Sequence, residues 1–134
     1  LNLDEAGKNY GWPVVGFGVN YRSGTAIHAG TTRAGMEQPV NVWVPSIAVQ
    51  NIVIYTGDKF PEWKGSFFVG SLVGERLVRL TLDGKTVKNV ENMVQGRGRI
   101  RGLGQSPDGF IYLAFEDAAG GPSKLVRLEP VRRS

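Results

Sequence analysis

The chain has 134 residues with a formal net charge of +4, and hydrophobic residues make up 41% of it. This size and this apolar share suit one folded domain and exclude a disordered tail. The sequence contains no cysteine, which excludes disulfides, thiolate catalysis and zinc–thiolate sites. No apolar run approaches the roughly 20 residues that a membrane-spanning helix needs, so we expect no membrane span.

Short apolar runs separated by glycine and proline predict strands rather than helices along the chain. In chain order, the predicted strands are 13–20, 40–44, 51–57, 66–72, 76–82, 86–94, 99–105, 110–115 and 124–130. Residues 21–38 are polar and rich in Gly and Thr, and they predict a long loop. Strands at roughly ten-residue spacing are typical of antiparallel all-β proteins.

Two turn signals are strong. Asp83-Gly84 separates two strand patterns, and so does the segment Ser106-Pro107-Asp108-Gly109. Both fit tight hairpins, because glycine adopts positive φ readily and proline presets the turn.

An internal repeat indicates how the strands are grouped. The tetrapeptide LVRL occurs at 77–80 and at 125–128, and each copy follows an aromatic strand pattern. A repeated unit of aromatic strand, turn and LVRL strand predicts antiparallel β-propeller blades. A blade takes four strands, so residues 1–134 predict a single partial propeller segment of about two blades.

Three arginines alternate at the start of the predicted strand 99–105 and in the turn just before it: Arg97, Arg99 and Arg101. On an extended chain, residues two apart point to the same face. Such a stripe can face water, a nucleic acid or a small anionic ligand. The remaining basic residues are spread out, apart from an Arg132–Arg133 pair, and lack the dense patch of a nucleic-acid-binding domain. We therefore expect no nucleic-acid partner.

Five segments together resemble the C-terminal part of the soluble pyrroloquinoline quinone (PQQ)-dependent aldose sugar dehydrogenases of the glucose/sorbosone type. They are NYGWPVVGFGVNYRSG (9–24), GMEQPVNVWVPSIA (35–48), YTGDKFPEWKGSFFVGSL (55–72), LVRLTLDG (77–84) and RIRGLGQSPDGFIYL (99–113). The resemblance implies a six-bladed propeller that holds PQQ with a calcium ion and oxidises an aldose sugar to its lactone. It also implies a periplasmic or secreted protein and a homo-oligomer.

The resemblance assigns roles to four residues. Arg99 and Arg101 match an R-x-R motif that contacts the cofactor, and their guanidinium groups suit the carboxylates of PQQ, a tricarboxylate. Arg97 is a secondary candidate, because it lies in a glycine-flanked turn. Trp43 matches an aromatic residue placed against the PQQ plane. Tyr10 matches a position whose backbone carbonyl binds a structural calcium.

The sequence also departs from the family pattern. The single histidine, His28, does not match the catalytic base and is interpreted as a solvated loop residue. Val73 stands where some relatives carry a cofactor-contacting lysine, and Gly102 stands where an acid follows R-x-R. The chain begins in mid-pattern without Met, so we expect a segment of a longer protein that contributes cofactor-face arginines and no catalytic residue.

Two other functions stay open. One is a non-catalytic β module that self-associates, because two blades leave sheet edges exposed. The other is a basic nucleic-acid binder, for which the charge pattern gives less support.

Overall fold

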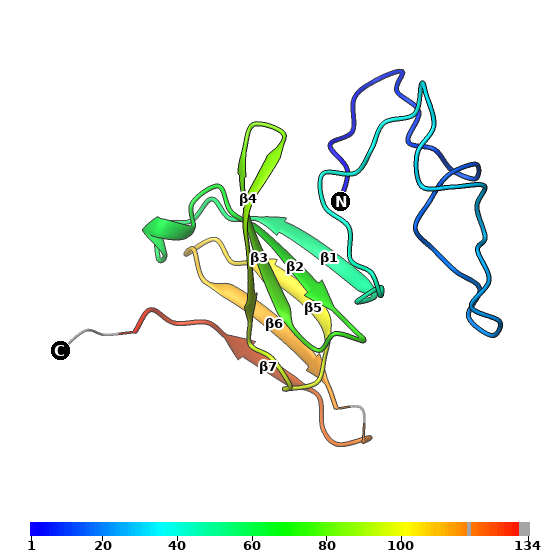
Figure 1. Ribbon diagram of the computed structural model, residues 1–134. Coiled ribbons are helices and arrows are strands. Elements are labelled where there is room, and N and C mark those ends of the chain that lie inside the picture. Colours follow the sequence, from blue (N-terminus) through cyan, green and yellow to red (C-terminus); the bar gives the residue numbers. More distant parts are fainter. Residues whose placement is uncertain (118, 132–134) are drawn as a thin grey trace. The chain divides into compact units, whose positions relative to one another are not determined.

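The computed structural model describes residues 1–117 and 119–131, so the Arg132–Arg133 pair lies outside the described residues. The chain divides into two compact units, Leu1–Ser46 and Ile47–Ser134. All strands lie in the second unit (Figure 1): β1 Val49–Ile54, β2 Phe67–Ser71, β3 Leu77–Asp83, β4 Thr86–Met93, β5 Arg99–Gln105, β6 Ile111–Glu116 and β7 Lys124–Arg127. Over the described ranges there is no α-helix, and so none that could cross a membrane.

The strands form two antiparallel sheets, each of which follows chain order. The first sheet has the order β1-β2-β3-β4 and the second has the order β5-β6-β7. An antiparallel meander of four strands is the unit of a propeller blade. The prediction of an all-β protein built from antiparallel blade sheets is therefore confirmed.

Both predicted hairpin turns are confirmed. Asp83 pairs with Thr86 across the β3–β4 turn, where Gly84 has a φ of 56°. Gly109, with a φ of 87°, donates its amide to the Ser106 carbonyl in the β5–β6 turn. The two LVRL copies also take equivalent places, because β3 follows β2 in one sheet as β7 follows β6 in the other.

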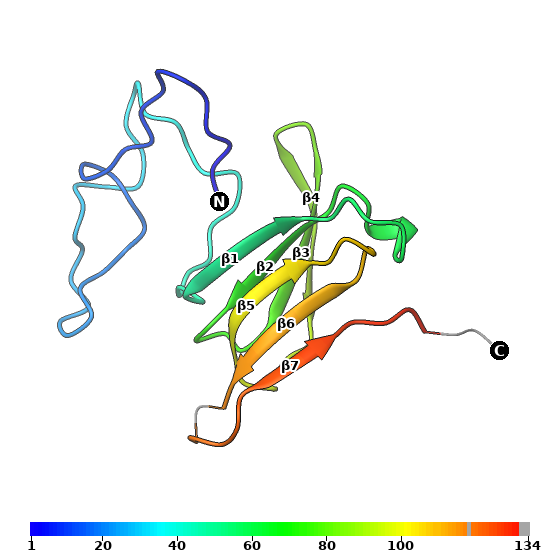
Figure 2. The ribbon, with the colours of Figure 1, turned by 180° about the vertical axis from the view of Figure 1, so that it is seen from behind.

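The core lies between the two sheets, where β5 packs against β1 and β2 (Figure 2). It consists of Tyr55, Phe60, Phe68, Leu77, Ile100, Leu103, Ile111, Leu113 and Phe115. Burial alternates along β6, which is the pattern of a strand with one face on a core. Gly70 brings the backbone of β2 close to Ile100, since a Cβ at Gly70 would lie 2.8 Å from Ile100 Cγ2.

Two predicted strands, 13–20 and 40–44, were wrong. The amides of Val14 and Val15 both donate to the Gly11 carbonyl, so the chain turns there instead of extending. Only an isolated bridge, Val19 to Ala26, remains near the first segment. The second segment lies between Pro39 and Pro45, which have no amide hydrogen to donate to a ladder.

The other strands were predicted within a few residues of their bounds. The strand predicted at 51–57 is β1, which begins and ends earlier, at Val49 and Ile54. The strand predicted at 124–130 is β7, which ends at Arg127. The prediction for 99–105 matches β5 at both ends.

Candidate arginine face and aromatic pocket

A β-bulge at the start of β5 positions the arginine pair. Arg99 opposes Glu116 and Ile100 opposes Phe115, but the next paired residue is Gly102, so Arg101 is the extra residue of the bulge. Ile100 and Leu103 are both buried although they are three positions apart. The bulge thus keeps these two side chains in the core and leaves Arg101 outside.

Arg99, Arg101 and Glu116 share the outward side of this sheet, and we call these three residues the arginine face. Arg101 Nε donates a hydrogen bond to Glu116 Oε2 at 2.5 Å. The Arg101 guanidinium, with a weaker contribution from Arg99, holds the pKa of the Glu116 carboxyl below its ordinary value. Glu116 is therefore ionised at neutral pH, and the face carries two positive charges and one negative charge.

Arg99 is exposed, and its side chain forms no hydrogen bond or ion pair with any described residue. The side chain of its register partner, Glu116, accepts a hydrogen bond from Arg101 instead. The face therefore presents one unengaged guanidinium beside one that is already paired. A guanidinium offers a planar fork of donors that matches a carboxylate, so this arrangement suits an anionic ligand.

Arg97 does not extend this face. It lies between Gly96 and Gly98, whose φ values of 67° and 110° form the turn before β5. Arg97 instead lines a separate pocket of about 530 Å³, together with Glu75, Gly96, Gly98, Phe115, Asp117, Ala119, Lys124 and Val126. Both signs of charge are present there, and neither Arg99 nor Arg101 lines it.

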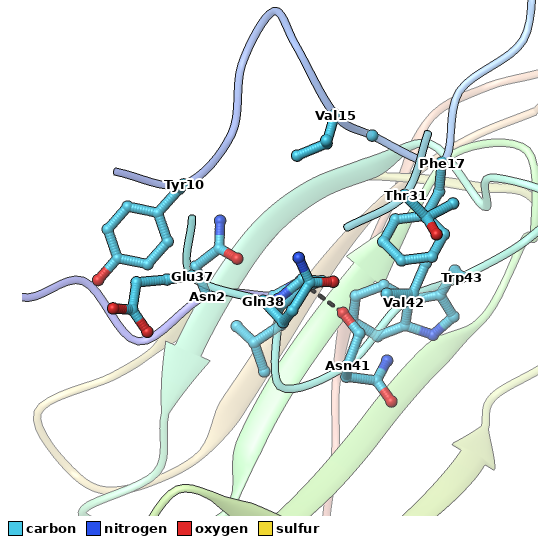
Figure 3. A pocket seen from close by; sticks show the side chains of 13 residues that line it. Asn2, Tyr10, Val15, Phe17, Thr31, Glu37, Gln38, Asn41, Val42 and Trp43 are labelled. Carbon is cyan, nitrogen blue, oxygen red and sulfur yellow. Dashed lines mark hydrogen bonds between the residues drawn. The ribbon is translucent and has the colours of Figure 1, made fainter. Parts of the chain in front are cut away.

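Trp43 and Tyr10 come together in the first unit. Both line a pocket of about 240 Å³ that Phe17, Asn41 and Val42 also border (Figure 3). The Tyr10 hydroxyl donates to the Leu3 carbonyl and accepts from the Glu5 amide, each at 2.7 Å. The four predicted site residues thus fall into two groups, an arginine pair in one unit and an aromatic pair in the other.

His28 differs from its interpretation as a solvated loop residue. Its Nδ1 lies 2.8 Å from the Pro13 carbonyl oxygen, and its ring packs edge-on against Trp12 with centroids 5.1 Å apart. The ring also lies over Gly16, where a Cβ would come within 2.6 Å of it. His28 is therefore a partly buried packing residue, and the absence of a side chain at Gly16 leaves room for its ring.

A side-chain cage for a metal ion is absent from residues 1–117 and 119–131, since no three His, Cys, Asp or Glu residues there are grouped for one.

The sequence did not predict Glu116 as a member of the arginine face. The turn at 106–109 fixes which residues of β5 and β6 face each other, but a regular ladder places Glu116 opposite Ile100 rather than Arg99. Only the bulge brings Glu116 to the arginines.

Comparison with known proteins identifies the family. The family model for glucose/sorbosone dehydrogenase matches residues 1–127. Aldose sugar dehydrogenase YliI of Escherichia coli K12 is 35% identical over 132 residues, which cover 97% of this chain and 35% of YliI.

Two solved structures are also similar. A glucose dehydrogenase crystal structure superposes with a TM-score of 0.85 at 35% identity, over 97% of this chain and 38% of that one. The PQQ-bound aldose sugar dehydrogenase of Streptomyces coelicolor gives a TM-score of 0.66 at 26% identity, over 96% of this chain and 35% of that one. The chain thus spans little more than a third of the length of these relatives, and it belongs to the glucose/sorbosone dehydrogenase family.

Proposed function

We propose that this chain is a segment of a PQQ-dependent sugar dehydrogenase and that its arginine face binds carboxylates of the cofactor. The whole protein would oxidise an aldose to its lactone. The observation that carries the proposal is the outward pair Arg99 and Arg101 at the start of β5, because the Arg99 side chain forms no hydrogen bond or ion pair with any described residue. When bound, PQQ supplies the oxidant, because it accepts the hydride that leaves the sugar.

The chemistry of the arginine face fits such a ligand. PQQ carries three carboxylates, and the face has a net charge of +1. A hydrogen bond that involves a charged group contributes about 1.5–3 kcal/mol net. Arg99 offers such a bond directly, and Arg101 offers one when its bond to Glu116 is exchanged.

Trp43 and Tyr10 keep their predicted roles as proposals. The Trp43 ring is half-buried and lines the pocket of the first unit, where it presents a flat apolar surface to a planar ring system. For Tyr10, calcium binding through its backbone carbonyl stays a prediction. Calcium ligation of this kind depends little on the side chain.

We further propose that this segment does not oxidise sugars by itself. A general base must lie within hydrogen-bond reach of the proton that it removes. The histidine of this chain, His28, does not match the position of the family's catalytic base, and its ring packs against Trp12 with Nδ1 on the Pro13 carbonyl. The base would come from the part of the protein outside this segment.

The proposal is tested by calorimetric titration of PQQ, with calcium present, into the chain and two single variants. Arg99→Ala removes the unengaged guanidinium, whereas the control Arg97→Ala removes the same charge from a position outside the face. We expect Arg99→Ala to weaken binding roughly ten- to a hundredfold, since a charged hydrogen bond is lost. Arg97→Ala should change binding less than about threefold, because the exposed Arg97 charge lines a separate pocket and is screened by salt. Equal losses in both variants, or no binding to the unmodified chain, would contradict the proposal.

The self-associating module remains a second candidate, and one observation favours it. β1 is an edge strand of its sheet, and Val49, Ile52 and Ile54 on it are exposed. Exposed apolar edge strands favour pairing between chains. Light scattering that gives a monomer mass at high concentration would exclude this function. A larger mass that Ile52→Lys returns to the monomer would support it.

A further inference from the structure

Glu116 forms an ion pair that differs from the other arginine pair inside the strands. Arg79, only 16% exposed, binds Glu91 at 2.8 Å while its guanidinium also lies over the Trp63 ring and donates to Ser66. Arg101 and Glu116 are 49% and 39% exposed, and no aromatic ring or second described acceptor holds the Arg101 guanidinium. Further contacts therefore hold the Arg79 guanidinium in place, whereas the Arg101–Glu116 pair depends on the contact between its own two side chains.

The carboxylate of Glu116 lies where a ligand carboxylate would bind. It takes the Nε donor of Arg101, and Glu116 is also the register partner of Arg99. Exposed ion pairs contribute little to stability, so replacing the Glu116 carboxylate on Arg101 by another carboxylate costs little free energy. The charged groups at this position are the guanidinium groups of Arg99 and Arg101 on β5 and the carboxylate of Glu116 on β6.

We infer that Glu116 is a specificity-determining residue of the arginine face, because its carboxylate occupies Arg101 until a carboxylate of the ligand displaces it. The inference rests on the proposed carboxylate-binding role of the face and deepens it. A monocarboxylate finds only Arg99 unengaged and meets the negative charge of Glu116 beside it. A ligand with two or more carboxylates engages Arg99 first and then replaces Glu116 on Arg101.

The test titrates citrate, a simple tricarboxylate, into the unmodified chain, Glu116→Gln and Glu129→Gln. Glu129 pairs with Arg127 after β7, so Glu129→Gln changes the net charge equally but away from the face. We expect Glu116→Gln to bind citrate about fivefold more tightly, which corresponds to about 1 kcal/mol. Glu129→Gln should leave citrate affinity within about twofold of the unmodified chain, because the exposed charge it removes is screened from the face.

A second readout follows the displacement directly. Binding of citrate should raise the pKa of Glu116, measured by NMR in the unmodified chain, because the carboxyl loses Arg101 and gains an anionic neighbour. Unchanged or weaker citrate binding by Glu116→Gln would overturn the inference, as would the absence of binding in both. So would a Glu116 pKa that does not rise.

Titration of PQQ into the same proteins separates the two proposals. If citrate binds more tightly to Glu116→Gln but PQQ binds to neither protein, the cofactor role fails and the inference about Glu116 stands. If PQQ binds through Arg99 but Glu116→Gln gains no affinity for citrate or PQQ, the cofactor role stands and the inference fails.

Discussion

The Tyr55 hydroxyl donates a hydrogen bond of 2.7 Å to the carbonyl of Gly109, a residue 54 positions later in the chain. The same hydroxyl accepts the Phe60 amide at 3.1 Å, and Tyr55 is fully buried. Gly57 lies so close that a Cβ there would come within 2.8 Å of Gly109 Cα. This contact joins the segment after β1 to the β5–β6 turn, and so fastens one sheet to the other.

Tyr55→Phe tests this contact. The substitution keeps the ring in the core but leaves the Gly109 carbonyl and the Phe60 amide without their partner. We expect the free energy of unfolding to fall by about 1–3 kcal/mol, the usual cost of an unsatisfied buried polar group. Urea denaturation measures it. Tyr21→Phe is the control, because Tyr21 is fully exposed, and a similar loss in both variants would contradict the role of Tyr55.

Gly70→Ala tests the close approach of the two sheets. Its Cβ would lie 2.8 Å from Ile100 Cγ2 in the packed core, so we expect a loss of about 1–3 kcal/mol from overpacking. Gly104→Ala is a matched control in β5, since a Cβ there meets nothing within 4 Å. It should be neutral or stabilise by up to about 1 kcal/mol. Thermal unfolding measures the stability of both variants. Equal effects would count against a tight contact at Gly70.

Gly16→Ala tests the packing of His28. The new methyl group would lie 2.6 Å from His28 Cδ2, so the ring must leave its position against Trp12. We expect the ring-current shifts of the His28 protons in the NMR spectrum to be lost. Gly30→Ala should preserve them, because a Cβ at Gly30 meets nothing within 4 Å. Unchanged shifts in Gly16→Ala would mean that the ring does not occupy this place in solution.

The pH dependence of stability tests the Arg101–Glu116 pair. Arg101 lowers the pKa of Glu116 from an ordinary value of 4.5. A lowered carboxyl pKa stabilises the fold above the ordinary value, and this contribution is lost as the pH falls through the folded value. We therefore expect the stability advantage of the unmodified chain over Glu116→Gln to be present at neutral pH and to disappear in acid below pH 4.5.

Glu62→Gln is the control for this titration, because Glu62 is exposed and forms no ion pair with any described residue. Its effect on stability should be small. Chemical denaturation at several pH values measures both variants. An advantage of Glu116 that persists in acid would show that the residue contributes through something other than its charge.

Local signals in the sequence predicted most of the second unit. The turn at Asp83-Gly84 and the turn at 106–109 were identified because glycine and proline restrict the backbone locally. The strands between them followed from apolar and β-branched runs. Residues 13–20 have a similar composition, but no neighbouring strand pairs with them beyond one bridge, and a strand needs a partner.

The position of the arginine pair required the tertiary structure. In a regular strand, Arg99 and Arg101 would share a face with Leu103, which is buried in the core. Because of the bulge at Arg101, Arg99 and Arg101 lie on the side opposite to Leu103. The charges are therefore outside the core, where Arg101 binds Glu116. Burial of Ile100 and Leu103 together favours the bulge, since a regular ladder would place Arg101 opposite the buried Phe115.

The sequence by itself determined the all-β class, the hairpin turns, the family resemblance and the arginine motif, because these depend on residue type and local spacing. Only the tertiary structure decided which side of β5 carries the arginines, that Glu116 is their partner, and that His28 is packed against Trp12. These features depend on pairing between distant segments, and a single inserted residue in a ladder changes the side to which every preceding side chain points.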